Sequence, residues 1–396
     1  MNDPAQAQKT PHATDRFGTV VVGAALGLIA ISTIAIVLTF RQHFQIGGHV
    51  WNTADWLINA DQVHVRRGLF GSGLLRVTDA LGISPLLGVV VLQSGLCVLI
   101  ALGAAAAILR PPARHLKALL LLSPGFTLLF LAGDLSAAAR KEILTFAAMA
   151  ILLLTTGQSR RDRALVAAAS AIFWIGVAGH IANAMMAPMF LYMAWIALDR
   201  PALRGPFGAF VGLTCLWAAF NTWYPIQFSD LADWQPVCDP LIARGLSPDI
   251  CERAISVTGG RAIDAVAFVA ERAFTIGDGK WHLIIYPVLV AQIIYLISRT
   301  DGLNKIAWPF ALSFLPILPL YTVGFDWGRQ TVMHITPVIL LAVLLVVRGE
   351  IQQKKAIPMF ASTLLILSAI AWAPRHTFGI EYGLAIRIIL STLGAV

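Results

Sequence analysis

Long apolar stretches alternate with short polar connections along almost the whole chain. The eleven stretches cover residues 18–40, 84–109, 118–133, 143–157, 164–179, 181–198, 206–224, 282–298, 306–325, 330–347 and 356–373, and none has Asp, Glu, Lys or Arg near its middle. A helix crosses a bilayer with about 20 apolar residues and pairs its backbone polar groups internally. The pattern therefore predicts an all-α, polytopic transmembrane helical bundle of about eleven spans.

The composition agrees with this class. Hydrophobic residues make up 58% of the 396 residues and charged residues only 13%, with a mean hydropathy of +0.75. A soluble domain has about a quarter of its residues charged. We expect residues 1–17 to form a cytoplasmic tail and residues 18–396 to form a single membrane domain.

The charges between the stretches predict the orientation. If the N-terminus is inside, the short inner loops and the tail hold fifteen of the 29 basic residues but only six of the 21 acidic residues. This bias is the positive-inside rule. It predicts a multi-pass protein with a cytoplasmic N-terminus, and it explains the net charge of +8 without a nucleic-acid partner.

Two connections on the predicted outer side are long. The first, residues 41–83, interleaves tryptophans and leucines with charges, which favours helices lying in the membrane interface. The second, residues 225–280, contains Cys238 and Cys251. In an oxidising compartment a disulfide between these two cysteines would close a loop of about 14 residues, worth roughly 3 kcal/mol. The alternative is two unrelated loop cysteines.

The first candidate site lies in the first outer loop, where residues 65–73 read VRRGLFGSG. Arg66 and Arg67 offer planar donor forks that suit phosphate. Gly68, Gly71 and Gly73 would let backbone N–H groups approach an anion. The alternative is an interfacial turn whose arginines extend to lipid headgroups.

A second candidate site is the short outer turn at residues 134–142, DLSAAARKE. It contains four ionisable groups, namely Asp134, Arg140, Lys141 and Glu142. Such a group can bind a charged substrate. It can also be a helix cap that neutralises itself.

The third and fourth candidates flank other outer turns. Residues 325–330 read FDWGRQ, so Asp326 and Arg329 adjoin on a helix and can simply pair with each other. Trp327 can be a residue of the aromatic belt or a flat surface for a sugar ring, and His334 follows about one turn deeper. His180 ends another span without a metal-ligand companion at recognisable spacing. For His180, a satisfied or solvated histidine is the alternative to a binding role.

All four candidates fall on the same predicted face of the membrane, and the inner loops contain no phosphate-binding loop. Arginines at the edge of the lipid suit a diphosphate headgroup, and tryptophans, carboxylates and a histidine suit a sugar. The layout of a first span, a long outer loop with interfacial helices and many further spans resembles the GT-C glycosyltransferases. The runs RRGLFG, ARKE and DWGR are similar to segments of bacterial polysaccharide-cluster proteins, and the second long outer loop with arginines nearby is similar to O-antigen polymerases and ligases.

The resemblance implies a glycosyltransferase or glycan polymerase that uses a polyprenyl-(di)phosphate-linked glycan at the outer face of a bacterial inner membrane. It places a catalytic carboxylate in the first outer loop, where Asp55 and Asp61 stand, with Asp134 as the further candidate for the base. That loop lacks paired acids, so we expect no metal and no other cofactor.

Two other functions fit the same pattern. A transporter or flippase for a lipid-linked or anionic substrate would use a broken helix, which Pro124 and Gly125 could provide, although no acidic residue within a span accompanies them. A non-catalytic subunit of an envelope assembly complex is the third possibility.

Overall fold

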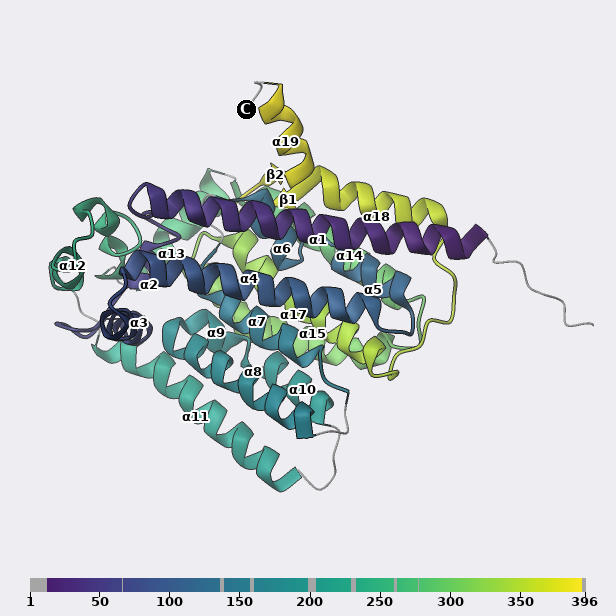
Figure 1. Ribbon diagram of the computed structural model, residues 1–396, viewed down its shortest axis with the longest axis horizontal. Coiled ribbons are helices and arrows are strands. Elements are labelled where there is room, and N and C mark those ends of the chain that lie inside the picture. The colour runs from purple at the N-terminus through teal and green to yellow at the C-terminus, as the bar shows by residue number, and fades with distance from the viewer. Residues whose placement is uncertain are drawn as a thin grey trace, which may run out of the picture.

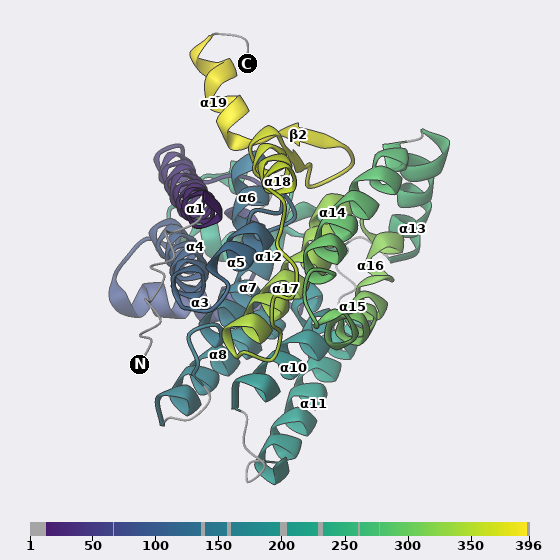
Figure 2. The same ribbon diagram turned by 90° about the vertical axis from the view of Figure 1, so that its right-hand side faces the viewer.

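The structure of this protein is a computed structural model that describes residues 13–65, 67–135, 139–156, 160–198, 204–228, 233–259, 262–276 and 278–393. It is 75% helical with almost no sheet, as the apolar pattern predicts. Most of the long helices lie side by side, running roughly across the view of Figure 1. Figure 2 shows the same bundle from one end.

Among the described residues, six helical segments are long and apolar enough to cross a membrane. They are α1 (Ala13–Gln45), α4 (Pro85–Leu109), α8 (Arg160–Gly179), the segment Gly279–Ile297 that contains α14 (His282–Ile297), the segment Leu303–Val323 that contains α15 (Leu303–Ile317) and α16 (Leu320–Val323), and α17 (Trp327–Val347). Shorter apolar helices are α7 (Glu142–Leu152), α10 (Ala187–Leu198), the segment Pro206–Asn221 of α11 (Arg204–Phe228), and α18 (Met359–Ala371). These helices indicate a lipid bilayer environment, but they do not confirm the predicted count of about eleven spans.

The stretch at 118–133 is a broken helix. It divides into α5 (Arg114–Leu121) and α6 (Thr127–Gly133), with Pro124 and Gly125 between them. Proline has no backbone N–H and ends helices. The freed groups are paired again, because the hydroxyl of Thr336 donates to the carbonyl of Gly125 at 2.9 Å and Ser123 Oγ accepts from the Gly125 amide at 3.3 Å.

Helix α17 is the centre of the bundle. Almost every residue from Gly328 to Val346 is buried, and α5, α7, α10, α14 and α15 pack around it. Most of α17 is apolar on all sides, as expected of a helix that other helices surround. Only its N-terminal turn carries charge, and this turn lies at the candidate site.

The two classes of loop gather at opposite ends of the bundle. At the end with the basic runs, Arg110 Nη1 donates to the carbonyl of Thr155 at 2.9 Å, and Thr300 forms a β-bridge with Gln353. At the other end lie the connections with the candidate chemistry, between α1 and α4 and around α12 on the left of Figure 1. The structure thus brings together the loops that the charge pattern assigns to each side.

Small elements build this second end. They are α2 (Ala54–Leu57), α3 (Gly68–Leu81), α9 (Ile181–Met185), α12 (Gln235–Ile242), the 3-10 helices η2 (Pro248–Cys251), η3 (Ser256–Gly259) and η5 (Asp278–Trp281), α13 (Ala262–Ala270), the π-helix η4 (Glu271–Thr275), the strands β1 (Trp372–Pro374) and β2 (Ile380–Tyr382), and α19 (Leu384–Thr392). Cys238 on α12 and Cys251 on η2 form a disulfide, with their Cα atoms 6.0 Å apart. The strands form an antiparallel hairpin that pairs Trp372 with Tyr382.

Candidate functional site

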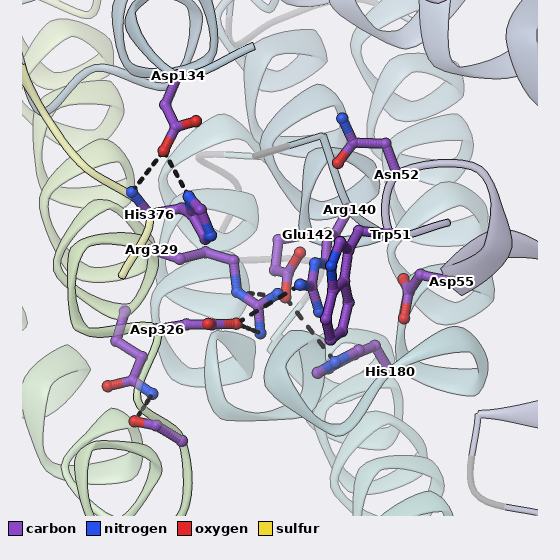
Figure 3. Close-up of polar contacts among 12 residues, drawn as sticks. Trp51, Asn52, Asp55, Asp134, Arg140, Glu142, His180, Asp326, Arg329 and His376 are labelled. Carbon is purple, nitrogen blue, oxygen red and sulfur yellow. Dashed lines mark hydrogen bonds and ion pairs between the residues drawn. The ribbon is translucent and has the colours of Figure 1, made fainter. Parts of the chain in front are cut away.

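Charged side chains from separate segments meet at this end of the bundle in what we call the ion cluster (Figure 3). Its members are Asp55 of α2, Arg67 before α3, Arg140, Lys141 and Glu142 at the start of α7, His180 before α9, and Asp326 and Arg329 at the start of α17. The structure therefore brings together residues from all four candidate segments of the sequence.

Asp326 and Glu142 hold the centre of the ion cluster. The Asp326 carboxylate lies 3.1 Å from Arg329 Nη2 and 3.9 Å from Arg140 Nη2. Glu142 Oε1 lies 3.6 Å from Arg329 Nε and 4.0 Å from His180 Nε2. Burial favours the neutral form of Asp326, but the charges of Arg329 and Arg140 outweigh it and lower the pKa of this carboxyl.

Asp55 belongs to a second, deeper part of the ion cluster. It is completely buried, and its carboxylate lies 3.4 Å from Arg67 Nη1. Burial opposes ionisation, but the charges of Lys141, Arg67 and Arg140 overcome it and lower the pKa of Asp55. This geometry makes Asp55 a fixed counter-ion and gives no support to its predicted role as a base.

Lys141 is also completely buried. Its ammonium group donates to the carbonyl of Arg67 at 3.2 Å and lies 5.5 Å from the ring centre of Phe70. Burial lowers the pKa of Lys141 to about 8, although Asp55 acts in the opposite direction. Its contacts are with the protein itself, so the structure favours a supporting role for this lysine.

Two of the three glycines after Arg67 lie in close contact with another segment. A Cβ on Gly71 would lie 2.0 Å from the carbonyl oxygen of Ile58, and one on Gly68 would lie 2.7 Å from the Cβ of Ala60. Both positions fall in α3, which lies directly against the segment after α2. A Cβ on Gly73 would meet nothing within 4 Å. Arg67 itself has φ 70°, a left-handed conformation that costs energy in a residue other than glycine.

Several buried atoms of the ion cluster have no hydrogen-bond partner among the described residues. They include Arg140 Nε, Arg329 Nε and Nη1, both Glu142 oxygens and His180 Nε2. Leaving such a group unpaired costs about 1–3 kcal/mol, so unmatched groups gathered at one place are unusual within a folded core. Both donors and acceptors are unmatched, which suits a ligand that combines an anion with hydroxyl groups.

His180 is neutral in this setting. Its Nδ1 accepts the backbone N–H of Ala182 at 2.9 Å, so the imidazole proton sits on Nε2 and faces Glu142. Burial, with the positive charges of Arg67 and Arg329, holds the pKa of His180 well below its usual value. His180 can therefore donate one hydrogen bond towards the centre of the cluster.

Sequence reasoning missed three side chains of this region. The guanidinium of Arg140 lies 5.0 Å from the ring centre of Trp51, and Asn52 Nδ2 donates to the carbonyl of Leu135 at 3.1 Å. His376, in the β1–β2 hairpin, donates to Asp134 Oδ2 from its Nδ1 at 2.5 Å and from its backbone N–H at 2.8 Å. Figure 3 shows the His376 ring beside Arg329. His376 lies far along the chain from the predicted motifs, so no sequence pattern marked it as a site residue.

Two predicted site residues lie elsewhere. Asp61 is on the surface, 3.9 Å from Arg244, which binds Asp79 more closely at 2.7 Å. Both ring nitrogens of His334 have partners within the bundle, the Tyr286 hydroxyl at 2.8 Å and the Phe310 carbonyl at 2.9 Å. Neither residue is a member of the ion cluster.

Trp327 packs in an aromatic group with His282, Phe378 and Tyr321, and its indole N–H donates to the carbonyl of Tyr321 at 2.9 Å. The Trp327 side chain therefore makes packing contacts within the protein.

Arg66 lies outside the described residues. Among those that are described, no three His, Cys, Asp or Glu side chains gather so as to hold a metal ion.

An open apolar groove of 1290 Å³ runs beside the ion cluster. It is lined by residues of α3, α4, α7, α8 and α11, including Phe70, Leu74, Leu144, Ala178 and Trp217. Phe70 links the two features, because it lines the groove and also lies against Lys141.

Comparison of the chain with family models, curated proteins and solved structures finds no match.

Proposed function

We propose that this protein is a membrane glycosyltransferase or glycan polymerase that uses a polyprenyl-(di)phosphate-linked sugar as donor. The observation that carries the proposal is the ion cluster, with its unmatched buried donors and acceptors, placed next to an apolar groove. A lipid-linked sugar has the same two parts, a charged and hydroxylated head beside a long apolar tail.

The head fits the unmatched atoms by chemical type. Arg140 Nε and Arg329 Nη1 are donors for phosphate oxygens. Glu142 accepts hydrogen bonds from sugar hydroxyls, and His180 Nε2 donates one. When the bond between the sugar and the phosphate breaks, negative charge grows on the leaving phosphate, and the two fixed guanidinium groups stabilise it.

The groove suits the tail. It begins at Phe70, beside Lys141, and continues along α3, α4 and α11 between apolar side chains. A polyprenyl chain in this groove would hold the headgroup at the ion cluster, and binding energy from the tail would then position the reacting atoms. The loop charges favour the outer face of the inner membrane for this end.

The first test measures binding of the leaving group without knowledge of the sugar. Purified protein in detergent is heated with polyprenyl diphosphate and, as an uncharged control, with polyprenyl alcohol. At 100 times Kd a ligand stabilises the folded state by about 2.7 kcal/mol, which raises Tm by a few degrees. We expect this shift with the diphosphate in the unmodified protein and its loss in Arg140→Ala and Arg329→Ala.

Arg244→Ala is the matched control, because it removes a guanidinium group at the same end but outside the ion cluster. Equal shifts in all four proteins would contradict the proposed headgroup site.

The second test measures transfer from a panel of polyprenyl-diphosphate-linked sugars in proteoliposomes. Loss of one arginine should lower kcat by about 10²–10³-fold. Lys at position 140 or 329 should restore little, because an ammonium group lacks the planar fork. Movement of the donor between leaflets without a new glycosidic bond would instead identify a flippase.

A further inference from the structure

We propose that His376, oriented by Asp134, is the base that removes the proton from the acceptor hydroxyl. This inference rests on the proposed transferase function and names a residue for one of its steps. Asp134 is then a positioning residue, and neither Asp55 nor Asp61 takes the proton.

The geometry of the pair fixes the ring of His376. Asp134 Oδ2 accepts from His376 Nδ1 at 2.5 Å and from the backbone N–H of the same residue at 2.8 Å. A hydrogen bond from Nδ1 leaves Nε2 of the neutral imidazole as an acceptor. Asp134 is 3% exposed, so it is held in the core, whereas the His376 side chain is 17% exposed and can meet a substrate.

The hairpin brings this ring to the ion cluster. The carbonyl of His376 accepts the backbone N–H of Arg329 at 3.1 Å, and the carbonyl of Thr377 accepts that of Gly328 at 2.9 Å. A Cβ on Gly328 would lie 1.6 Å from the carbonyl oxygen of Arg375, so only glycine permits this approach. The loop of the hairpin is thus attached to the first turn of α17, beside Asp326 and Arg329 (Figure 3).

The other carboxylates of the ion cluster lie beside cations. Asp55 is completely buried beside Arg67, and Asp326 is held between Arg140 and Arg329. Glu142 is buried too, with Oε1 3.6 Å from Arg329 Nε. A carboxylate with two guanidinium neighbours is a weak base. His376 has a carboxylate on Nδ1, which stabilises the imidazolium that forms when Nε2 takes a proton.

The step balances as a displacement at the anomeric carbon. The acceptor oxygen forms a bond to that carbon while its proton moves to Nε2 of His376. The bond between the anomeric carbon and the phosphate oxygen breaks, and its electron pair leaves with the polyprenyl (di)phosphate at Arg140 and Arg329. Proton loss from Nε2 to solvent restores the neutral ring.

The test uses the full-length protein in proteoliposomes with the polyprenyl-diphosphate-linked sugar that the unmodified protein transfers. His376→Ala should lower kcat by about 10²–10⁴-fold, with the polyprenyl diphosphate affinity changed less than threefold. Added imidazole should restore part of the rate in His376→Ala and none in Arg140→Ala, since a purely structural histidine would not be replaced in this way.

Two variants guard against loss of folding. His376→Asn keeps a side-chain N–H donor for Asp134 but has no basic nitrogen, so we expect a stable protein with the same loss of rate. Thr377→Ala, one residue along the same loop, should transfer at the unmodified rate. Asp134→Asn should also lower kcat, because an amide does not stabilise the imidazolium.

The outcomes separate the two proposals. Transfer that is lost in Arg140→Ala but kept within threefold in His376→Ala and His376→Asn would overturn the assignment of the base and leave the transferase function in place. Absence of both diphosphate binding and transfer in the unmodified protein would overturn the function and the base together.

Discussion

At the residue scale, the ion cluster uses its charges in two ways. Asp55 Oδ1 pairs with Arg67, and Lys141 donates to the Arg67 backbone carbonyl, so these three residues are held mainly by one another. Arg140, Arg329 and Glu142 keep several atoms that no described residue bonds, whereas Asp55 keeps only Oδ2. Breaking a buried pair typically costs 3–5 kcal/mol, because one charge is left without its counter-ion. The first group should therefore govern stability and the second should govern activity.

The buried Lys141 should make the free energy of unfolding depend on pH. Its pKa falls from 10.5 in a free side chain to about 8 in the folded protein. Between these two pH values the unfolded chain binds the extra proton, so the free energy of unfolding should rise with pH by up to about 1.4 kcal/mol per unit. The apparent Tm measured from pH 7.5 to 10.5 should rise relative to that of Lys141→Met. Parallel curves for the two proteins would show that this lysine does not titrate on unfolding.

The sequence predicted most members of the ion cluster but not how they divide. Arg140, Glu142, Asp326 and Arg329 stood out because charges are rare beside apolar spans. Asp55 and Asp61 looked equivalent, and only the fold shows that one is buried beside Arg67 and the other lies on the surface. His376 follows Arg375 after the last apolar stretch, and its partner Asp134 comes from another part of the chain, so no local motif marked it.

At the element scale, α3 packs against the segment after α2 through two glycines, Gly68 and Gly71. The position of Gly71 faces the carbonyl of Ile58, whereas that of Gly73 in the same helix faces open space. Hydropathy could not distinguish these glycines, because close approach of two backbones depends on tertiary structure. The break between α5 and α6 lies at Pro124 and Gly125, where the sequence suggested that a helix could be broken, whereas Pro337 lies inside the unbroken α17.

Paired substitutions test this contact. Gly71→Ala should destabilise the protein by about 1–3 kcal/mol through overpacking and should move Arg67 with the start of α3. Gly73→Ala should stabilise it by about 0.5–1 kcal/mol, because alanine is the better helix former and meets no neighbour. Thermal unfolding in detergent compares the two. Equal effects would mean that α3 does not pack as described.

At the scale of the whole molecule, the alternation of basic loops with chemically varied loops predicted which connections meet at each end. The structure brings these groups to opposite ends. The number of spans was harder to predict, because several apolar helices are shorter than a bilayer and their depth depends on packing against α17.

Orientation can be tested by cysteine labelling. In a variant with Cys97 and Cys215 replaced by serine, Lys280→Cys should react with an impermeant maleimide in intact spheroplasts. Gln352→Cys should react only after lysis. Both positions are exposed. The reverse pattern would place the ion cluster on the cytoplasmic side and exclude an outer-face enzyme.

The attachment of the β1–β2 hairpin also has a consequence for biosynthesis. His376 and the carbonyls that cap α17 follow every apolar stretch predicted to span the membrane, so during translation they leave the ribosome after all of them. Until this hairpin docks, Arg329 lacks its backbone partner and Asp134 lacks its histidine. A nascent chain therefore passes through membrane insertion without a complete site and becomes competent only when the bundle is assembled around α17.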